Sequence, residues 1–235
     1  IILDIASNDG TLLKKYKKRK VIKFGIDPTI KKFQKYYPKN YLKFPGFFEK
    51  NIYNKITNYK KSKIITSIAV FYDLQNPVKF IKDIKSILDN EGIWVLEQSY
   101  FPLLIKNNAY DSICHEHLSY FMHKQLNFLL KKEKLKIIDV SFNNMNGGSV
   151  RFFISHQESQ YKVNGKNLSK VLNIENKIFS NFNKSKNRFR KNIINSKKKI
   201  IYLINKLNKK NKIIHIYGAS TKGNVIIQFC GLTKK

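Results

Sequence analysis

Apolar runs alternate with helical patterns through the first half of the chain. Four short runs are rich in Ile, Leu and Val and end at turn residues, as buried strands do, and three segments have apolar residues at helical spacing. The strands are expected at 1–5, 21–26, 63–70 and 93–96, and the helices at 12–20, 77–88 and 125–132. This order is typical of a parallel sheet with helices on both faces, so the sequence predicts an α/β, Rossmann-like fold.

Two later runs predict an antiparallel hairpin that closes this sheet. Residues 136–142 and 149–155 both have the composition of strands. Between them, the cluster Asn-Asn-Met-Asn-Gly-Gly at 143–148 is a strong turn signal. A shorter turn is expected at 90–92, where Asn, Glu and Gly follow the helix 77–88.

Composition then changes, which predicts a division into three parts. From 162 to 212 the chain is basic and rich in Asn, with apolar residues at helical spacing, so one or two long helices are expected. A strand at 212–217, a Gly-containing turn at 218–224 and a helix start at 225–229 follow. One strand and one helix cannot bury a sheet face alone. We therefore expect a first domain at 1–157, linker helices at 158–211 and the incomplete start of a second Rossmann-like domain at 212–235.

The net charge of +31 raises the question of an anionic partner. Such a charge is one feature of proteins that bind nucleic acid or anionic membranes. The basic residues are scattered, however, and Lys, Asn and Ile are all favoured when the coding DNA is AT-rich. We attribute the charge mainly to drift in amino-acid composition under AT-rich coding, with an anionic substrate as a further contribution. A nucleic-acid-binding protein without catalytic activity remains an alternative.

Cysteine use and hydropathy indicate the compartment. Cys114 and Cys230 lie far apart, which fits neither a disulfide framework nor a CxxC zinc site. We expect a reducing, cytoplasmic location. No apolar run approaches the roughly 18 residues of a membrane span, so no membrane partner is expected.

The turn after the first strand has the composition of a cofactor loop. Ala6, Ser7 and Gly10 are small enough to let the backbone approach a ligand closely, and by analogy Asp4, Asn8 and Asp9 would face its cationic end. The pattern G-x-G-x-x-G is absent, so a pyrophosphate is not the obvious ligand. An acidic strand end with a looser turn suits S-adenosylmethionine, whose sulfonium and amino groups are cationic.

Two further strand ends would complete this site. Asp27 ends the second strand about twenty residues on, where a carboxylate accepts hydrogen bonds from ribose hydroxyls in this fold class. Ala69, Val70 and Phe71, at the end of the third strand, would flank the adenosine or the reacting methyl group. The alternative is that Asn8 and Asp27 are ordinary cap and turn residues.

The segment 110–120 has the densest set of reactive side chains. His115, Glu116 and His117 follow Cys114, on the expected carboxyl side of the sheet, where ligands bind in open α/β folds. Histidine is well suited to proton transfer near neutral pH, and the glutamate would bind substrate or orient an imidazole. The same residue types are zinc ligands, so a metal site is an alternative, as is a simple polar loop.

Several segments taken together resemble the NDP-sugar C-methyltransferases, which add a methyl branch to deoxysugars. The shared stretches are Asp4-Ile5-Ala6-Ser7-Asn8-Asp9-Gly10, Gly25-Ile26-Asp27-Pro28, Val70-Phe71-Tyr72-Asp73-Leu74, Gly92 to Tyr100, Cys114-His115-Glu116-His117-Leu118, Asn146 to Arg151 and Gly218 to Asn224. Their order and spacing hold over nearly the whole chain.

The resemblance implies an S-adenosylmethionine-dependent class I methyltransferase that acts on a nucleoside-diphosphate 4-keto-deoxysugar. His117 matches the family's base, which would remove the proton on C3 so that the enolate attacks the methyl group, with Glu116 and His115 beside it. Asp73 and Cys114 would line the sugar pocket, where the family often has His and Tyr. A methyltransferase acting on an oxygen or nitrogen acceptor is the alternative.

The two ends of the chain depart from the family. Its cysteine-rich N-terminal zinc module has no counterpart here, and no metal is expected. In the C-terminal turn, Ser220, Lys222 and Asn224 would contact the phosphates or other polar groups of the nucleotide sugar.

Overall fold

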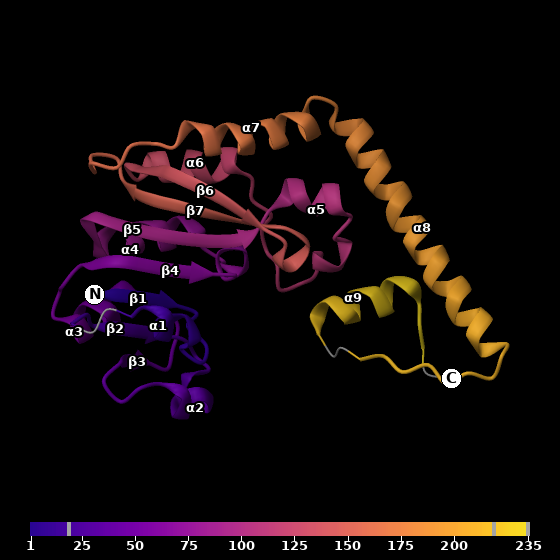
Figure 1. The fold of residues 1–235 in the computed structure, drawn as a ribbon, viewed down its shortest axis with the longest axis horizontal. Coiled ribbons are helices and arrows are strands. Elements are labelled where there is room, and N and C mark those ends of the chain that lie inside the picture. The colour runs from indigo at the N-terminus through magenta and orange to yellow at the C-terminus, as the bar shows by residue number, and fades with distance from the viewer. Residues whose placement is uncertain (18–19, 218–219, 234–235) are drawn as a thin grey trace.

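A seven-stranded sheet forms the centre of the computed structural model, which describes residues 1–17, 20–217 and 220–233 (Figure 1). The strands are β1 (Ile2–Ile5), β2 (Lys23–Ile26), β3 (Leu42–Phe44), β4 (Ser62–Ile68), β5 (Leu88–Ser99), β6 (Leu135–Asn143) and β7 (Ser149–His156). Their order is β3-β2-β1-β4-β5-β7-β6. β1 to β5 pair in parallel, and β7 pairs antiparallel with both β5 and β6. The predicted α/β, Rossmann-like fold with a closing hairpin is confirmed.

Nine α-helices and four short 3-10 helices connect the strands in the described residues. The helices are α1 (Thr11–Lys15), α2 (Ile30–Phe33), α3 (Lys50–Thr57), α4 (Pro77–Ile87), α5 (Phe101–Asn107), α6 (His123–Lys132), α7 (Gly165–Phe179), α8 (Phe182–Asn208) and α9 (Thr221–Cys230). The 3-10 helices are η1 (Gln34–Tyr36), η2 (Phe71–Asp73), η3 (Tyr110–Ser112) and η4 (Met145–Gly147).

Local capping explains where several helices begin. The Asn76 side chain accepts a hydrogen bond from the Lys79 amide at 2.9 Å, and Pro77 occupies the first turn of α4. Asparagine side chains cap α7 and α8 in the same way, through Asn164 and Asn181. These caps supply acceptors for amides that have no partner within the helix.

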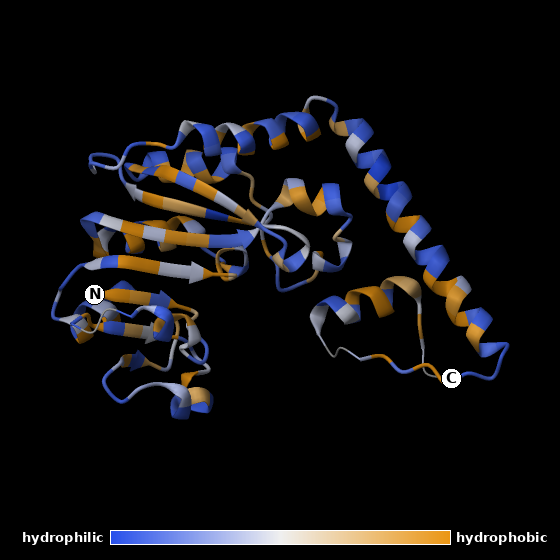
Figure 2. Cartoon of the chain, viewed as in Figure 1, coloured by the Kyte–Doolittle hydropathy of each residue, from blue (hydrophilic) through white to orange (hydrophobic). Residues whose placement is uncertain are grey.

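The main core lies between the sheet and α3, α4 and α6, which pack side by side. A second, smaller cluster of Ile2, Leu13, Ile30 and Tyr37 involves α1 and α2. Trp94 and Phe71 are fully buried, and their rings pack edge to face at 6.1 Å. The Trp94 indole also donates to the Ser67 hydroxyl at 2.8 Å. Figure 2 shows the apolar residues concentrated on the sheet and the helices that cover it. This packing fixes the strand ends that carry the candidate site.

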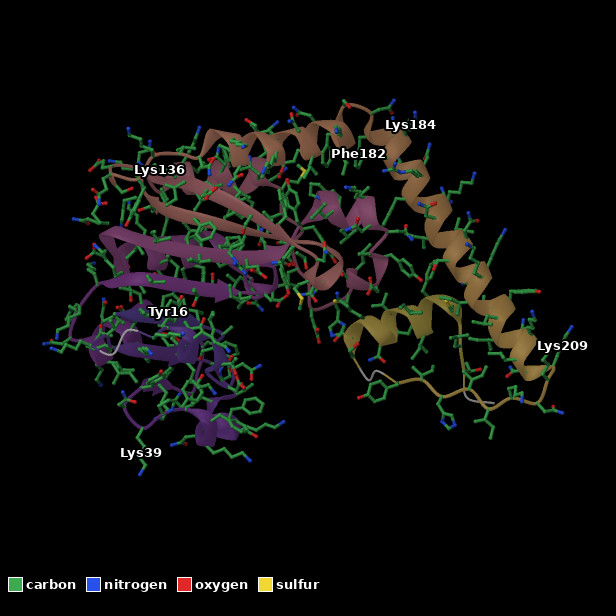
Figure 3. All side chains as sticks on the ribbon, in the orientation of Figure 1. Tyr16, Lys39, Lys136, Phe182, Lys184 and Lys209 are labelled. Atoms are coloured by element: carbon green, nitrogen blue, oxygen red, sulfur yellow. The ribbon has the colours of Figure 1, made fainter. Side chains whose placement is uncertain are left out.

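α7 packs against β6, and α8 then leads the chain away from the sheet (Figure 1). Ser185 is the single buried residue of α8, a helix that contacts α5, α7 and α9 on one side. Many of the other side chains of α8, including Lys184 and Lys209, extend outward from the helix (Figure 3). The prediction of long basic helices is therefore confirmed. No helix within the described ranges is long and apolar enough to cross a membrane.

Three local predictions differ from the structure. The helix expected at 12–20 ends at Lys15, and the turn expected at 90–92 lies inside β5, at a register shift against β4. The strand expected at 212–217 is wrong: this segment is irregular and exposed. Within the described ranges no strand lies beside it to satisfy its backbone hydrogen bonds, and an unpaired strand is not stable alone.

Candidate functional site

The loop after β1 adopts the tight geometry expected of a cofactor loop. Ala6, Asn8 and Gly10 all have positive φ angles, of 60°, 50° and 72°. Glycine adopts this region freely and asparagine tolerates it, so Ala6 is the residue that its surroundings must hold there. The Gly10 amide donates to the Ser7 carbonyl at 2.8 Å, which closes the turn.

Tyr37 contacts this loop through its hydroxyl and its ring. Its hydroxyl donates to the Asn8 carbonyl at 2.9 Å and lies 2.8 Å from the Ser7 hydroxyl. Its ring also explains why positions 10 and 25 are glycines. A Cβ on Gly10 would lie 2.7 Å from the ring edge, and a Cβ on Gly25 would lie 2.9 Å from it. Burial raises the pKa of Tyr37 to about 12, so it stays a neutral donor at physiological pH.

Asp27 joins the end of β2 to the same loop. Its Oδ2 accepts a hydrogen bond from the Asn8 amide at 3.0 Å, and its Oδ1 accepts from the amide and hydroxyl of Thr29. A carboxylate oxygen can accept two hydrogen bonds, so Oδ2 keeps one acceptor position for a ligand hydroxyl. Asp27 thus has both the turn role and the capacity for the ribose role.

Asp4 lies almost wholly buried in β1, where it accepts a hydrogen bond from the Thr66 hydroxyl. Burial raises the pKa of Asp4 to about 7, with the Thr66 hydrogen bond opposing the rise and the Asp27 charge adding to it. A cation placed at this strand end would favour the ionised carboxylate. This polarity fits a positively charged ligand rather than a phosphate.

The end of β4 contributes mainly backbone to the site. Ala69 has a φ of 55° and donates to the Glu97 carbonyl at 2.9 Å, so the chain turns sharply there. Val70 is half-buried, whereas Phe71 is fully buried against Trp94 and Phe121. The Phe71 side chain therefore belongs to the core, and only its main chain is placed to meet a ligand.

The reactive segment folds against η2. The imidazole of His117 packs on the Tyr72 ring with the centroids 4.5 Å apart, and the Ser119 amide donates to the Tyr72 carbonyl at 3.1 Å. These contacts place His117 at the carboxyl edge of the sheet, close to Asp73. Burial lowers the pKa of His117, and the Lys222 charge adds to this, while the Ser112 carbonyl and the Glu116 carboxylate oppose it.

The neighbours of His117 are more open to solvent. The side chain of His115 is 86% exposed and that of Glu116 is 55% exposed. Cys114 is half-buried. Asp73 lies at the surface of η2, where partial burial and the Glu116 charge raise its pKa to about 6. Of the three predicted catalytic residues, His117 alone combines partial burial with a fixed ring orientation.

The C-terminal helix touches this segment. The Thr221 hydroxyl donates to Glu116 at 2.9 Å, and the Lys222 ammonium donates to the Asn146 side chain at 3.3 Å. The Ser220 hydroxyl accepts from the Gly223 amide at 3.3 Å, so it caps α9. Asn224 is exposed. Gly218 and Ala219 of the predicted turn lie outside the described residues.

Two site residues were not found from the sequence. Tyr37 lies in a polar connection without periodicity, although glycines at both 10 and 25 could have indicated a large neighbour. The second is Glu97, a buried carboxylate on β5 that pairs with Arg151 at 2.6 Å and accepts from Asn143 at 3.0 Å. Its partners are distant in sequence, so the pairing has no local signal.

The residues at these strand ends fit S-adenosylmethionine. Gly10 lets the chain approach the ligand closely. Asp27 has a free acceptor position for the ribose hydroxyls, and the ionisable Asp4 would face the positive charge. A metal finds less support: in the parts of the chain that the structure describes, no three His, Cys, Asp or Glu side chains converge to hold one.

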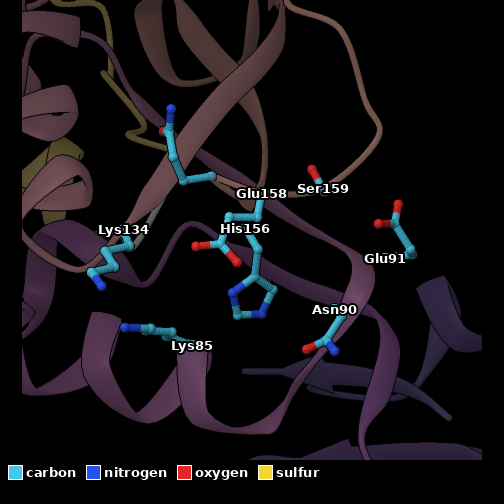
Figure 4. Close-up of a pocket in the computed structure, with 8 residues that line it drawn as sticks. Lys85, Asn90, Glu91, Lys134, His156, Glu158 and Ser159 are labelled. Atoms are coloured by element: carbon cyan, nitrogen blue, oxygen red, sulfur yellow. The ribbon is translucent and has the colours of Figure 1, made fainter.

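Two cavities lie away from these strand ends. One, of about 350 Å³, lies at the opposite edge of the sheet, where β5 begins and β7 ends (Figure 4). Lys85, Lys134, His156 and Glu158 are among its lining residues. The other, of about 650 Å³, lies along the C-terminal end of α8. Neither includes a predicted site residue.

Comparison with known proteins identifies both halves of the chain. Residues 1–140 match the methyltransferase domain, and residues 144–235 match the C-methyltransferase C-terminal domain. These matches meet inside the closing hairpin, whereas our predicted division lies at 157, after β7. The three-part division of the chain therefore stays a prediction.

Individual relatives are distant. The C-methyltransferase NovU of Streptomyces niveus is 23% identical over 164 residues, which are 69% of this chain and 39% of NovU. The chain thus spans well under half the length of that relative. Two solved structures share the fold: LepI in complex with SAM, and the methyltransferase bound to the Trm112 activator of Haloferax volcanii.

Their similarity is limited to the methyltransferase fold. LepI is 14% identical with a TM-score of 0.52, over 66% of this chain and 42% of LepI. The Haloferax volcanii methyltransferase complex is 10% identical with a TM-score of 0.52, over 66% of this chain and 82% of the other. Taken with the family matches over both halves, the chain belongs to the S-adenosylmethionine-dependent methyltransferases, among those that carry the C-methyltransferase C-terminal domain.

Proposed function

We propose that this protein transfers a methyl group from S-adenosylmethionine to C3 of a nucleoside-diphosphate 4-keto-deoxysugar. The observation that carries the proposal is the position of His117. Its half-buried imidazole lies beside Tyr72 of η2, directly after the Ala69 turn of the cofactor edge. A proton acceptor therefore stands next to the place where a methyl donor would bind.

His117 would act as the general base. A carbonyl at C4 acidifies the neighbouring C3–H bond, and a neutral imidazole nitrogen accepts that proton. The electron pair of the broken C–H bond is left on the C3–C4–O4 system as an enolate. S-adenosylmethionine, when bound, supplies the electrophilic methyl group to which C3 bonds, and its sulfur keeps the electrons of the broken S–CH3 bond. His117 then releases its proton to solvent.

The other predicted residues would bind and orient. Ala6, Ser7, Asn8 and Gly10 would form the floor under the methyl donor, with Asp4 facing its positive charge and Asp27 its ribose. Asp73 and Cys114 would line the sugar pocket. Ser220, Lys222 and Asn224 would contact the diphosphate side, and the hydrogen bond from Thr221 to Glu116 supports their position beside the reactive segment. We place the protein in the cytoplasm.

A proton-exchange experiment tests the base and the substrate together. A thymidine-diphosphate 4-keto-6-deoxyhexose is incubated with the protein and S-adenosylhomocysteine in D2O, and loss of the C3–H signal is followed by NMR. We expect exchange, and with S-adenosylmethionine a new C-methyl signal. His117→Gln should bind S-adenosylmethionine but lose both reactions.

A matched control separates this from a general loss of fold. His156 lies at the opposite edge of the sheet, so His156→Gln should leave exchange and methylation unchanged. Full exchange in His117→Gln would exclude His117 as the base. A methyl group found on oxygen or nitrogen would replace the proposed reaction with the alternative one.

A further inference from the structure

The imidazole of His117 has two tyrosine rings as neighbours. Tyr72 packs on it at a centroid distance of 4.5 Å and an angle of 59°, and Tyr120 lies 6.4 Å away at 66°. Tyr72 is 7% exposed, whereas Tyr120 is 36% exposed. Of the two rings, Tyr72 is therefore the one anchored in the interior, and Tyr120 is the one open to solvent.

Tyr72 also holds the backbone around His117. Its carbonyl accepts from the Ser119 amide at 3.1 Å, two residues after the histidine. The His117 amide donates to the Cys114 carbonyl at 3.2 Å, and the Tyr120 hydroxyl donates to the Ser112 carbonyl at 3.3 Å. The loop is thus closed on itself and fastened to η2 at the Tyr72 residue.

The backbone at Tyr72 is fixed by the core. Phe71, its neighbour in η2, is fully buried and packs against Phe80, Trp94 and Phe121. A residue fastened to the core in this way can fix the orientation of whatever packs on it. Catalysis by proton transfer needs such fixed geometry as well as the right protonation state.

We propose that Tyr72 is a positioning residue for His117, which holds the imidazole in one orientation and shields it from water so that it can accept a proton. The inference rests on the proposed role of His117 as base. It assigns Tyr72 no contact with substrate or cofactor. The phenol hydroxyl is not needed for this role, because the ring face and the backbone carbonyl make the contacts.

The charges around His117 define what should happen when the ring is removed. Glu116, from the same loop, and Lys222, from α9, act on the imidazole in opposite directions, and Asp73 and Cys114 face Tyr72. Burial is the largest influence, and it lowers the pKa of His117. Loss of the Tyr72 ring would admit water, so the pKa should rise toward its ordinary value.

NMR titration of the His117 C2–H signal tests this without substrate or cofactor. The signal is assigned by its loss in His117→Gln. We expect Tyr72→Leu to raise the pKa of His117, and Tyr72→Phe to leave it unchanged because the ring is kept. Tyr202→Leu, at an exposed position of α8, is the control and should also leave it unchanged. An unchanged titration in Tyr72→Leu would overturn the proposal.

The pH–rate profile then links the shift to turnover. With the sugar nucleotide as substrate, the acidic limb of kcat should move to higher pH in Tyr72→Leu, in step with the NMR titration. The value of kcat at pH 7 should fall by about tenfold while the KM for S-adenosylmethionine stays unchanged. A change in KM alone, with kcat intact, would contradict a positioning role.

One measurement needs no variant, which matters if Tyr72→Leu does not fold. In the natural chain, a nuclear Overhauser effect between the Tyr72 ring protons and His117 C2–H is expected at the observed ring distance, and its absence would overturn the proposal. The contact between Tyr72 and His117 and the shift in the titration could both be observed while no 4-keto sugar is methylated. That result would count against the proposed function alone.

Discussion

The hydroxyl of Tyr37 donates to the carbonyl of Asn8 at 2.9 Å. The bond joins the segment before β3 to the loop after β1, across 29 residues of sequence. Asn8 has a positive φ of 50°, and its amide donates to Asp27. The Tyr37 hydroxyl therefore helps to hold this left-handed turn at the centre of the cofactor edge.

Removal of this hydroxyl should weaken cofactor binding. In Tyr37→Phe, the ring still fills the space beside Gly10, but the Asn8 carbonyl and the Ser7 hydroxyl lose their partner. We expect the Kd for S-adenosylmethionine, measured by calorimetry, to rise about five- to tenfold, which corresponds to about 1 kcal/mol. Tyr36→Phe is the control, since Tyr36 is exposed on η1. Equal affinity in both variants would contradict a supporting role for Tyr37.

Asp4 should make the free energy of unfolding fall as pH rises. Its pKa is about 7 when folded and 3.8 in the reference state, so between these values the folded chain keeps a proton that the unfolded chain has lost. Full ionisation should cost up to about 4 kcal/mol above pH 7. Asp4→Asn should abolish this fall, matching the natural chain near pH 4 and exceeding it at pH 8.

Urea unfolding across pH 4 to 8 measures this difference. Asp9→Asn is the matched control, because Asp9 is a half-buried carboxylate of the same loop that accepts hydrogen bonds from the amide and hydroxyl of Thr11. The control should keep the slope of the natural chain over this range. A slope that persists in Asp4→Asn would show that another group titrates.

The sheet could be predicted from the sequence because its strands are continuous apolar runs bounded by turn residues. β3 could not be predicted, because it is only three residues long, has a lysine between Leu42 and Phe44, and lies at the edge of the sheet. The segment 212–217 has the composition of a strand but no partner, and strand formation depends on neighbours that composition does not reveal. The end of α1 was also misplaced, because helical spacing of apolar residues does not by itself show where a helix stops, and α1 ends at Lys15.

The candidate site shows the same limit. Asp27 and His117 could be predicted because strand ends and reactive residue types are visible in the sequence. Their supports were not, because Tyr37 reaches Asn8 and Tyr72 reaches His117 through tertiary contacts. The pairing of Glu97 with Arg151 spans 54 residues and needs the strand order β5-β7 to form.

Arg151→Met should destabilise the protein by leaving a buried charge unpaired. Glu97 is 7% exposed, and Arg151 binds one of its oxygens through both Nε and Nη2. Because the arginine side chain is 43% exposed, water can partly replace it, and we expect a loss of about 2 kcal/mol at pH 7 by urea unfolding. The double variant Glu97→Gln, Arg151→Met should recover most of this loss. If it recovers none, the lost stability does not come from the unpaired Glu97 charge.

Glu175 should be the residue that fastens α7 to the sheet. It is 7% exposed and accepts hydrogen bonds from the Tyr100 hydroxyl and the His123 amide, both at 2.6 Å. Glu175→Leu would leave two buried donors without a partner, at a cost of about 2–4 kcal/mol. Glu175→Gln keeps one acceptor oxygen and should cost less than half as much.

Limited proteolysis shows whether this loss is local. If Glu175 ties α7 down, Glu175→Leu should increase cleavage between 160 and 185 before the sheet unfolds, whereas Lys170→Leu, at an exposed position of the same helix, should not. Cleavage that begins throughout the chain would mean that α7 and the sheet unfold as one cooperative unit. In that case Glu175 would contribute to global stability, and α9 would keep its contact with Glu116 until the whole protein unfolds.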